Sequence, residues 1–156
     1  MISDSTSLTA SCLRLRLALG LAVAALALHG VMAVILIVTL ARLAPEARSV
    51  SPVFHLAFVA FILGALPLAQ LGAIAAATAI LWVTLTVASA IWAVSLLQLL
   101  RANPPAPLRP FLAIHLAPAA LLSLVAGELG LVSLALGLAV LGMVILLALL
   151  AAARWI

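Results

Sequence analysis

The sequence predicts an all-α integral membrane protein with about five transmembrane helices. Of its 156 residues, 69% are hydrophobic and 6% are charged, and the mean hydropathy is +1.52. Soluble domains are about half apolar and one quarter charged, and a chain this short exposes too much surface to hide such an apolar excess. The apolar runs are continuous over about 18 residues or more, whereas barrel strands alternate over about ten. Helices are therefore expected, because they satisfy their backbone polar groups internally in lipid.

The first helix is expected at about 16–41, after a polar N-terminal segment, 1–15. Arg14 and Arg16 before an apolar run resemble the start of a signal peptide. The run from Leu17 to Leu40 is, however, longer than the roughly 7–15 residues of a signal peptide's apolar region. It is long enough to cross a bilayer, so we expect a membrane helix.

Four further helices follow as two tight hairpins. They are expected at about 53–70, 73–100, 110–127 and 131–154. Very short turns at Gln70–Gly72 and Glu128–Gly130 join the members of each hairpin, whereas long, polar, basic breaks precede each hairpin. The chain thus reads as one helix plus two hairpins, with residues 16–156 forming the transmembrane domain.

The arginines predict a topology. Those expected on one side of the membrane are Arg42, Arg48, Arg101, Arg109 and Arg154. The positive-inside rule places that side in the cytoplasm of a multi-pass protein of the inner (plasma) membrane. The first helix then begins outside, as expected of a chain from which an odd number of preceding helices is missing. All seven basic residues are arginines at helix ends, and no clustered basic face for nucleic acid is present.

Residues that support covalent chemistry are scarce. The sequence contains no nucleotide-binding glycine loop, no Cys/His cluster with zinc spacing and no supported Ser-His-Asp set, so no enzyme activity, metal or cofactor is expected. His29, His55 and His115 lie on three different helices, where each is either a hydrogen-bonded packing residue or part of a metal site or proton relay. Glu128 is either a functional carboxylate or a solvated turn residue.

Two prolines are expected to kink the first helix of each hairpin. Pro67 cannot donate to the carbonyl of Leu63, and Pro118 cannot donate to that of Ile114. The kinked helices alternate with helices that lack proline, which favours a central path lined by the kinked pair. The alternative is that prolines are simply tolerated in membrane helices.

An aromatic stripe and two arginines are further candidates for a pore. Phe54, Phe58 and Phe61 fall on one face of a regular helix. They form either a hydrophobic constriction or a stripe that faces lipid or another helix. Arg101 and Arg109 are either pore-mouth residues that concentrate anions or positive-inside anchors.

The region between the two hairpins resembles a known family. Ile91–Arg101, followed by Leu108-Arg109-Pro110 and Ala117-Pro118, resembles the tellurite-resistance/C4-dicarboxylate transporter family, which includes the slow anion channels of plants; Ser51–Val59 resembles the start of that family's fifth helix. The resemblance implies a fold of ten helices in five hairpins, with proline-kinked odd-numbered helices around a pore. This chain would supply helices four to eight, without the ninth helix that carries the family's principal gating phenylalanine. The expected pore-lining residues are Phe54, Phe58, Phe61, Gly64, Pro67, His115 and Pro118.

The leading hypothesis is therefore a truncated or split anion channel or transporter of the tellurite-resistance/dicarboxylate type. Its expected partners are the lipid bilayer, small anions, and either further copies of itself or a complementary membrane chain. The alternative hypothesis is a non-transporting assembly subunit or scaffold, and a membrane enzyme is the weakest of the three.

Overall fold

The computed structural model describes residues 3–44, 51–101 and 106–153, and these form an all-helical chain. The α-helices and the two 3-10 helices (η) are α1 (Ser3–Arg42), α2 (Phe54–Phe58), η2 (Ala60–Gly64), α3 (Ala65–Gln70), α4 (Ile74–Arg101), η3 (Ala106–His115), α5 (Leu116–Glu128) and α6 (Val132–Ala153). We call α2–η2–α3 the first broken helix and η3–α5 the second broken helix.

Among the described residues, four helical stretches are long and apolar enough to cross a membrane. They are Leu19–Arg42, Ile74–Arg101, Phe111–Glu128 and Val132–Ala151, and the first broken helix, Phe54–Gln70, is a shorter apolar helix. The coarse prediction of an all-helical membrane protein is confirmed.

The predicted helix bounds differ most at the N-terminus. α1 begins at Ser3, well before the expected start near residue 16. No proline or glycine interrupts the chain before Gly20, and each residue added to an existing helix gains one hydrogen bond. The polar segment 1–15 is therefore largely an extension of the first membrane helix rather than a separate element. At the other end of the chain, residue 154 lies outside the described residues.

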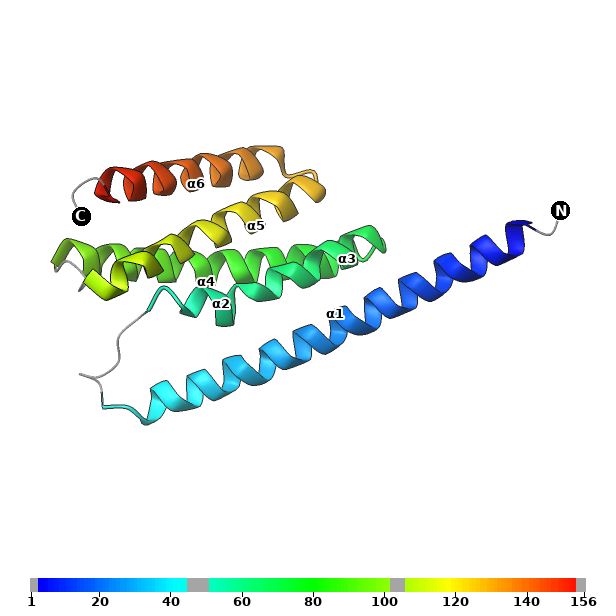
Figure 1. The fold of residues 1–156 in the computed structure, drawn as a ribbon, viewed down its shortest axis with the longest axis horizontal. Coiled ribbons are helices and arrows are strands. Elements are labelled where there is room, and N and C mark those ends of the chain that lie inside the picture. Colours follow the sequence, from blue (N-terminus) through cyan, green and yellow to red (C-terminus); the bar gives the residue numbers. More distant parts are fainter. Residues whose placement is uncertain (1–2, 45–50, 102–105, 154–156) are drawn as a thin grey trace.

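The helices run up and down in alternating directions (Figure 1). Arg42 and Arg101 end α1 and α4 at one end of the bundle, which we call the arginine end. The two tight turns lie at the opposite end, which we call the hairpin end. This agrees with the expected grouping of Arg42 and Arg101, whereas the side of the membrane that they face stays a prediction. The side chains of Arg48, Arg109 and Arg154 lie outside the described ones.

Both hairpins use the same turn. Gly72 and Gly130 adopt positive φ angles of 79° and 74°, a conformation that side chains disfavour. In each turn the amide after the glycine donates back to a helical carbonyl, from Ala73 to Leu68 (2.9 Å) and from Leu131 to Ala126 (2.8 Å). This is the Schellman pattern that ends helices at glycine, and it explains why so few residues suffice to reverse the chain.

Both proline-containing helices are interrupted, as expected, although the interruption is a 3-10 segment. η2 ends at Gly64, three residues before Pro67, and η3 ends at His115, three residues before Pro118. The proline removes the N–H that an α-helical carbonyl four residues upstream would need. The chain upstream of that point follows the tighter 3-10 pattern instead.

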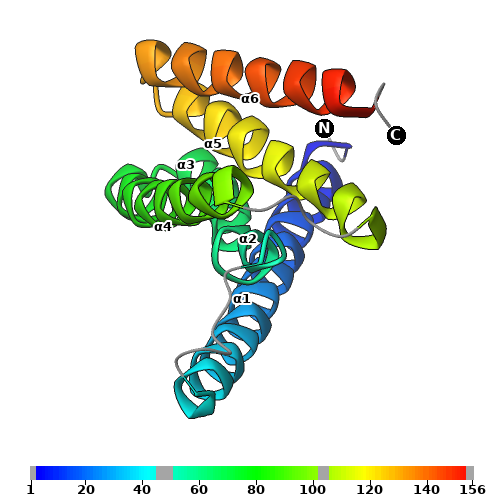
Figure 2. The same ribbon diagram turned by 90° about the vertical axis from the view of Figure 1, so that its left-hand side faces the viewer.

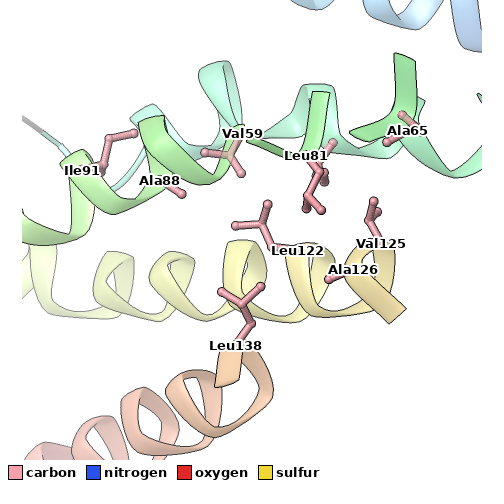
Figure 3. Close-up of a cluster of buried hydrophobic side chains, with 11 residues drawn as sticks. Val59, Ala65, Leu81, Ala88, Ile91, Leu122, Val125, Ala126 and Leu138 are labelled. Carbon is pink, nitrogen blue, oxygen red and sulfur yellow. The ribbon is translucent and has the colours of Figure 1, made fainter. Parts of the chain in front are cut away.

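The core lies between α4 and the two broken helices (Figures 2 and 3). α4 contributes one face with residues spaced by four and three: Ala77, Leu81, Thr84, Ala88, Ile91 and Ser95. Three large side chains of this core have no exposed surface: Ile62 of η2, Leu81 of α4 and Leu122 of α5. Apolar side chains therefore fill the space between the broken helices at this level.

Three threonine hydroxyls in the helices are satisfied within their own helix. Thr39, Thr84 and Thr86 each donate to the carbonyl four residues earlier, at 2.7–2.8 Å. Ser123 donates to the Ala135 carbonyl at 2.8 Å and so ties α5 to α6. Such bonds let polar residues reside in apolar helices at little cost.

α1 packs loosely against the rest of the bundle. Only 6% of the most apolar part of its span is buried. Its contacts are with the first broken helix, where Leu26 covers Gly64 and the ring of His29 lies edge-on to Phe61 with centroids 6.1 Å apart. The N-terminal end of α1 projects beyond the other helices (Figure 1).

We expect Gly64→Ala to weaken the packing of α1, because the added Cβ would lie 2.7 Å from both terminal carbons of Leu26. Because these atoms are the far end of a flexible side chain that can turn away, we expect a cost of about 1 kcal/mol or less, measured as a lower thermal midpoint in micelles. Adding Leu26→Ala should restore the midpoint. The matched control is Gly30→Ala, where a Cβ meets nothing within 4 Å. Equal effects at both glycines, or no rescue, would contradict the packing described.

Candidate functional site

Two histidines from different broken helices meet inside the bundle. His55 Nε2 and His115 Nδ1 share a hydrogen bond of 2.9 Å, which the protonated nitrogen of the two donates. The rings stand edge-to-face, with centroids 5.0 Å apart and an interplanar angle of 86°. Only 2% of His55 and 7% of His115 is exposed. The contact joins residues 60 positions apart in the chain.

The local structure places both rings at the breaks in the helices. His55 lies in the single turn of α2, and His115 is the residue at which η3 changes into α5. Pro118 explains this position, because the 3-10 segment must give way to the α-helix upstream of the proline. Both histidines lie nearer the arginine end than the hairpin end, because His55 is the second residue of the first broken helix and Trp92, which contacts both, lies in the second half of α4, which ends at Arg101.

Trp92 of α4 contacts both partners. Its indole Nε1 donates to the backbone carbonyl of His115 at 3.2 Å. Its ring lies against that of His55, with centroids 5.5 Å apart and an interplanar angle of 49°. Trp92 therefore links α4 to the first broken helix by ring contact and to the second by a hydrogen bond. We call His55, Trp92 and His115 the imidazole site.

Three buried polar atoms at or near this site have no hydrogen-bond partner among the described residues: His55 Nδ1, His115 Nε2 and Ser95 Oγ. Ser95 lies one helical turn beyond Trp92 on the buried face of α4. An unpaired buried group of this kind costs about 1–3 kcal/mol. Because most buried polar groups in proteins are paired, three open ones in one region indicate a site that binds or passes something polar.

The three phenylalanines do not form the single stripe that was expected. Phe54 and Phe58 contact each other edge-to-face, with centroids 6.1 Å apart, and pack against the core. Phe61 instead contacts His29 of α1. The sequence did not indicate this contact, because it depends on how α1 packs against the first broken helix.

The remaining candidates are dispersed. Gly64 faces Leu26 of α1, Pro67 is half-buried, and Pro118 is buried. Arg101 is exposed at the end of α4, and the side chain of Arg109 lies outside the described ones. Of the expected pore-lining residues, only His115 belongs to the imidazole site. The pore-lining and pore-mouth roles stay predictions.

Sequence reasoning missed the pairing of His55 with His115. It placed the three histidines on separate helices and singled out only His115 as lining a path. The available signal was that His55 and His115 occupy the two proline-containing helices, which the hairpin pattern already set side by side. Nothing in the sequence indicated the contacts of Trp92 with both histidines.

Metal ligation by a larger cluster finds no support in the part of the chain that the structure describes. No group of three or more His, Cys, Asp or Glu side chains could hold a metal ion there. The two imidazoles are engaged with each other through one nitrogen each, so they do not form a chelate as they stand.

The sequence matches no protein-family model, and no curated protein or solved structure is significantly similar to it. The function must therefore be argued from the imidazole site and the helices that build it.

The histidine pair should show energetic coupling. In a double-mutant cycle with His55→Ala and His115→Ala, we expect a coupling of about 0.5–1.5 kcal/mol, because each single change removes the same hydrogen bond. Unfolding in micelles measures it. His29→Ala combined with His115→Ala is the control and should be additive, because His29 bonds only to the Ala25 carbonyl of its own helix, at 3.2 Å. If the effects of His55→Ala and His115→Ala on the free energy of unfolding add up as they do in the control, the contact is refuted.

Proposed function

We propose that this chain is a membrane transport protein that passes small anions along its two broken helices. The observation that carries the proposal is the imidazole site, a pair of ionisable side chains buried among helices apolar enough to cross a membrane. Ionisable residues at such depth are expensive and mark ion or substrate paths.

The broken helices support a transport role. In lipid, irregular backbone is tolerated only where it is buried in protein or lines a water-filled cavity. Interrupted helices are also the elements that form binding sites in many transporters. Here η2 contributes Ile62 to the core, and the other interruption, η3, ends at His115, whose ring hydrogen bonds to His55 of the first broken helix.

The chemistry of the site favours an anion. The open groups at the imidazole site are imidazole nitrogens, and Ser95, one helical turn beyond Trp92 on the buried face of α4, adds a hydroxyl; both kinds of group can donate hydrogen bonds to an anion. Cation sites are typically built from carboxylates and carbonyls. Across the four spans and the first broken helix, Glu128 is the only acidic residue, and it stands at the last position of α5.

We propose five spans, with the first broken helix as the fifth. Its five 3-10 residues rise about 2.0 Å each and the others about 1.5 Å, so Phe54–Gln70 extends about 28 Å. This is close to the roughly 30 Å of the hydrocarbon core. The 3-10 segment thus compensates for the shortness of this helix. The plasma membrane, with the arginine end in the cytoplasm, is the proposed location.

Five spans would be half of the ten-helix fold of the tellurite-resistance/C4-dicarboxylate transporter family, which the sequence resembles. The apolar surface of α1 supports a partner, because only 6% of the most apolar part of its span is buried. A second copy or a complementary membrane chain would cover that surface and complete a pore. The same surface favours the second candidate function, a membrane assembly subunit that does not transport.

Chloride or nitrate uptake into liposomes that contain the purified protein tests the proposal. We expect uptake by the natural chain and a decrease of about fivefold in Ser95→Ala, the effect of losing one hydrogen bond worth about 1 kcal/mol. The thermal midpoint should not fall, and should rise, because the substitution removes a buried hydroxyl that has no partner.

Ser133→Ala is the matched control, since Ser133 lies exposed on α6. Its uptake should equal that of the natural chain. No uptake by any of the three proteins would favour the assembly subunit. Uptake that is equal in Ser95→Ala and Ser133→Ala would place the path away from the imidazole site.

A further inference from the structure

The histidine pair contains one proton more than its hydrogen bond needs. A neutral imidazole carries one N–H, so two neutral rings hold two protons. One lies in the bond between His55 Nε2 and His115 Nδ1. The other must sit on His55 Nδ1 or on His115 Nε2, the two outer nitrogens without a partner. One end of the pair is therefore a bare acceptor and the other end is a donor.

We propose that His55 and His115 form a proton relay that couples proton movement to the proposed passage of anions, on which this inference rests. A proton binds the bare outer nitrogen of one ring, the bridging proton moves to the second ring, and the second ring releases the proton on its outer nitrogen. One proton enters and one leaves, so the pair is neutral before and after. Both rings end in the opposite tautomer and must turn, or pass a proton back, before the next transfer.

Trp92 suits the cationic intermediate of this transfer. The indole ring lies 5.5 Å from the centroid of the His55 ring, within the range at which an aromatic face attracts a cation. Its N–H holds the backbone carbonyl of His115. The same side chain therefore stabilises positive charge on one ring and positions the backbone that carries the other.

The charged side chains of the neighbouring elements leave the pair undisturbed. Among the described residues, the only side chain that hydrogen bonds to either imidazole is the other imidazole. Arg42 and Arg101 are exposed at the arginine ends of α1 and α4, and Glu128 is exposed at the hairpin end of α5. His29 of α1 faces Phe61 and its own helix. As far as the described side chains are concerned, the proton balance of the pair is set by the two rings themselves.

The position of the pair explains why proton and anion would move together. The pair lies toward the arginine end, because His55 stands at the start of the first broken helix and Trp92, which contacts both residues, lies in the second half of α4. Ile62, Leu81 and Leu122, which have no exposed surface, pack in the core between the broken helices and α4. An anion that travels along the broken helices must displace this packing, and the same opening admits the water that a proton needs beyond the relay.

The test follows anion uptake and internal pH together in liposomes that contain the full chain, using a chloride gradient and an enclosed pH dye. The natural chain should acidify the interior as chloride enters. His55→Gln and His115→Gln should abolish acidification, because a carboxamide keeps a hydrogen-bonding group but does not relay protons at neutral pH. His29→Gln is the matched control and should acidify like the natural chain. Transfer through the pair should also be slower in D2O.

Each other outcome decides between the two proposals. Chloride uptake without acidification in the natural chain would overturn the relay and leave anion transport standing. Acidification that needs both histidines but no chloride would keep a proton relay, overturn its coupling to anions, and refute anion transport. Acidification that persists in both glutamine variants would overturn the relay. Stoichiometric Zn²⁺ binding that is lost in both variants, with acidification unchanged, would reassign the pair to a metal site.

Discussion

The hydrogen bond between His55 and His115 joins the two broken helices where both rings are buried. In such surroundings a polar atom without a partner costs about 1–3 kcal/mol, so either ring alone would be a liability. Together they satisfy one nitrogen each, and Trp92 binds the second helix through the His115 carbonyl. The packing of α2, η3 and α4 at the arginine end depends on this three-way contact, and the open nitrogens give it a chemistry beyond packing.

Proline determines where that contact can form. Pro118 ends the 3-10 segment η3 at His115, and Pro67 stands three residues after the end of η2. At the other end of the bundle, Gly72 and Gly130 close both hairpins with the same turn. Each hairpin therefore combines an interrupted helix with a continuous one. In the two units side by side, α2 packs against η3, and the apolar core of Ile62, Leu81 and Leu122 lies between the broken helices and α4.

The sequence predicted the coarse fold well, because hydropathy and helix-breaking residues act locally. The hairpins at Gly72 and Gly130 and the interruptions upstream of Pro67 and Pro118 follow from single residues. The early start of α1 at Ser3 was not predicted. A helix continues until a stop signal ends it, and polar residues alone are not such a signal. The contact of Phe61 with His29 was not predicted either, because it depends on how α1 packs against the first broken helix. The imidazole site was not predicted either. The sequence around one residue does not show which faces of the helices pack against each other.

The most direct test of the account is nitrogen NMR of the protein reconstituted in lipid bilayers with ¹⁵N-labelled histidine. The account predicts a coupling across one hydrogen bond between a Nδ1 and a Nε2 of two different rings. It predicts that the coupling disappears in His55→Gln and in His115→Gln and survives in His29→Gln. Three histidines with no coupling between rings, or a coupling that His29→Gln abolishes, would contradict the pairing on which the site and both proposals rest.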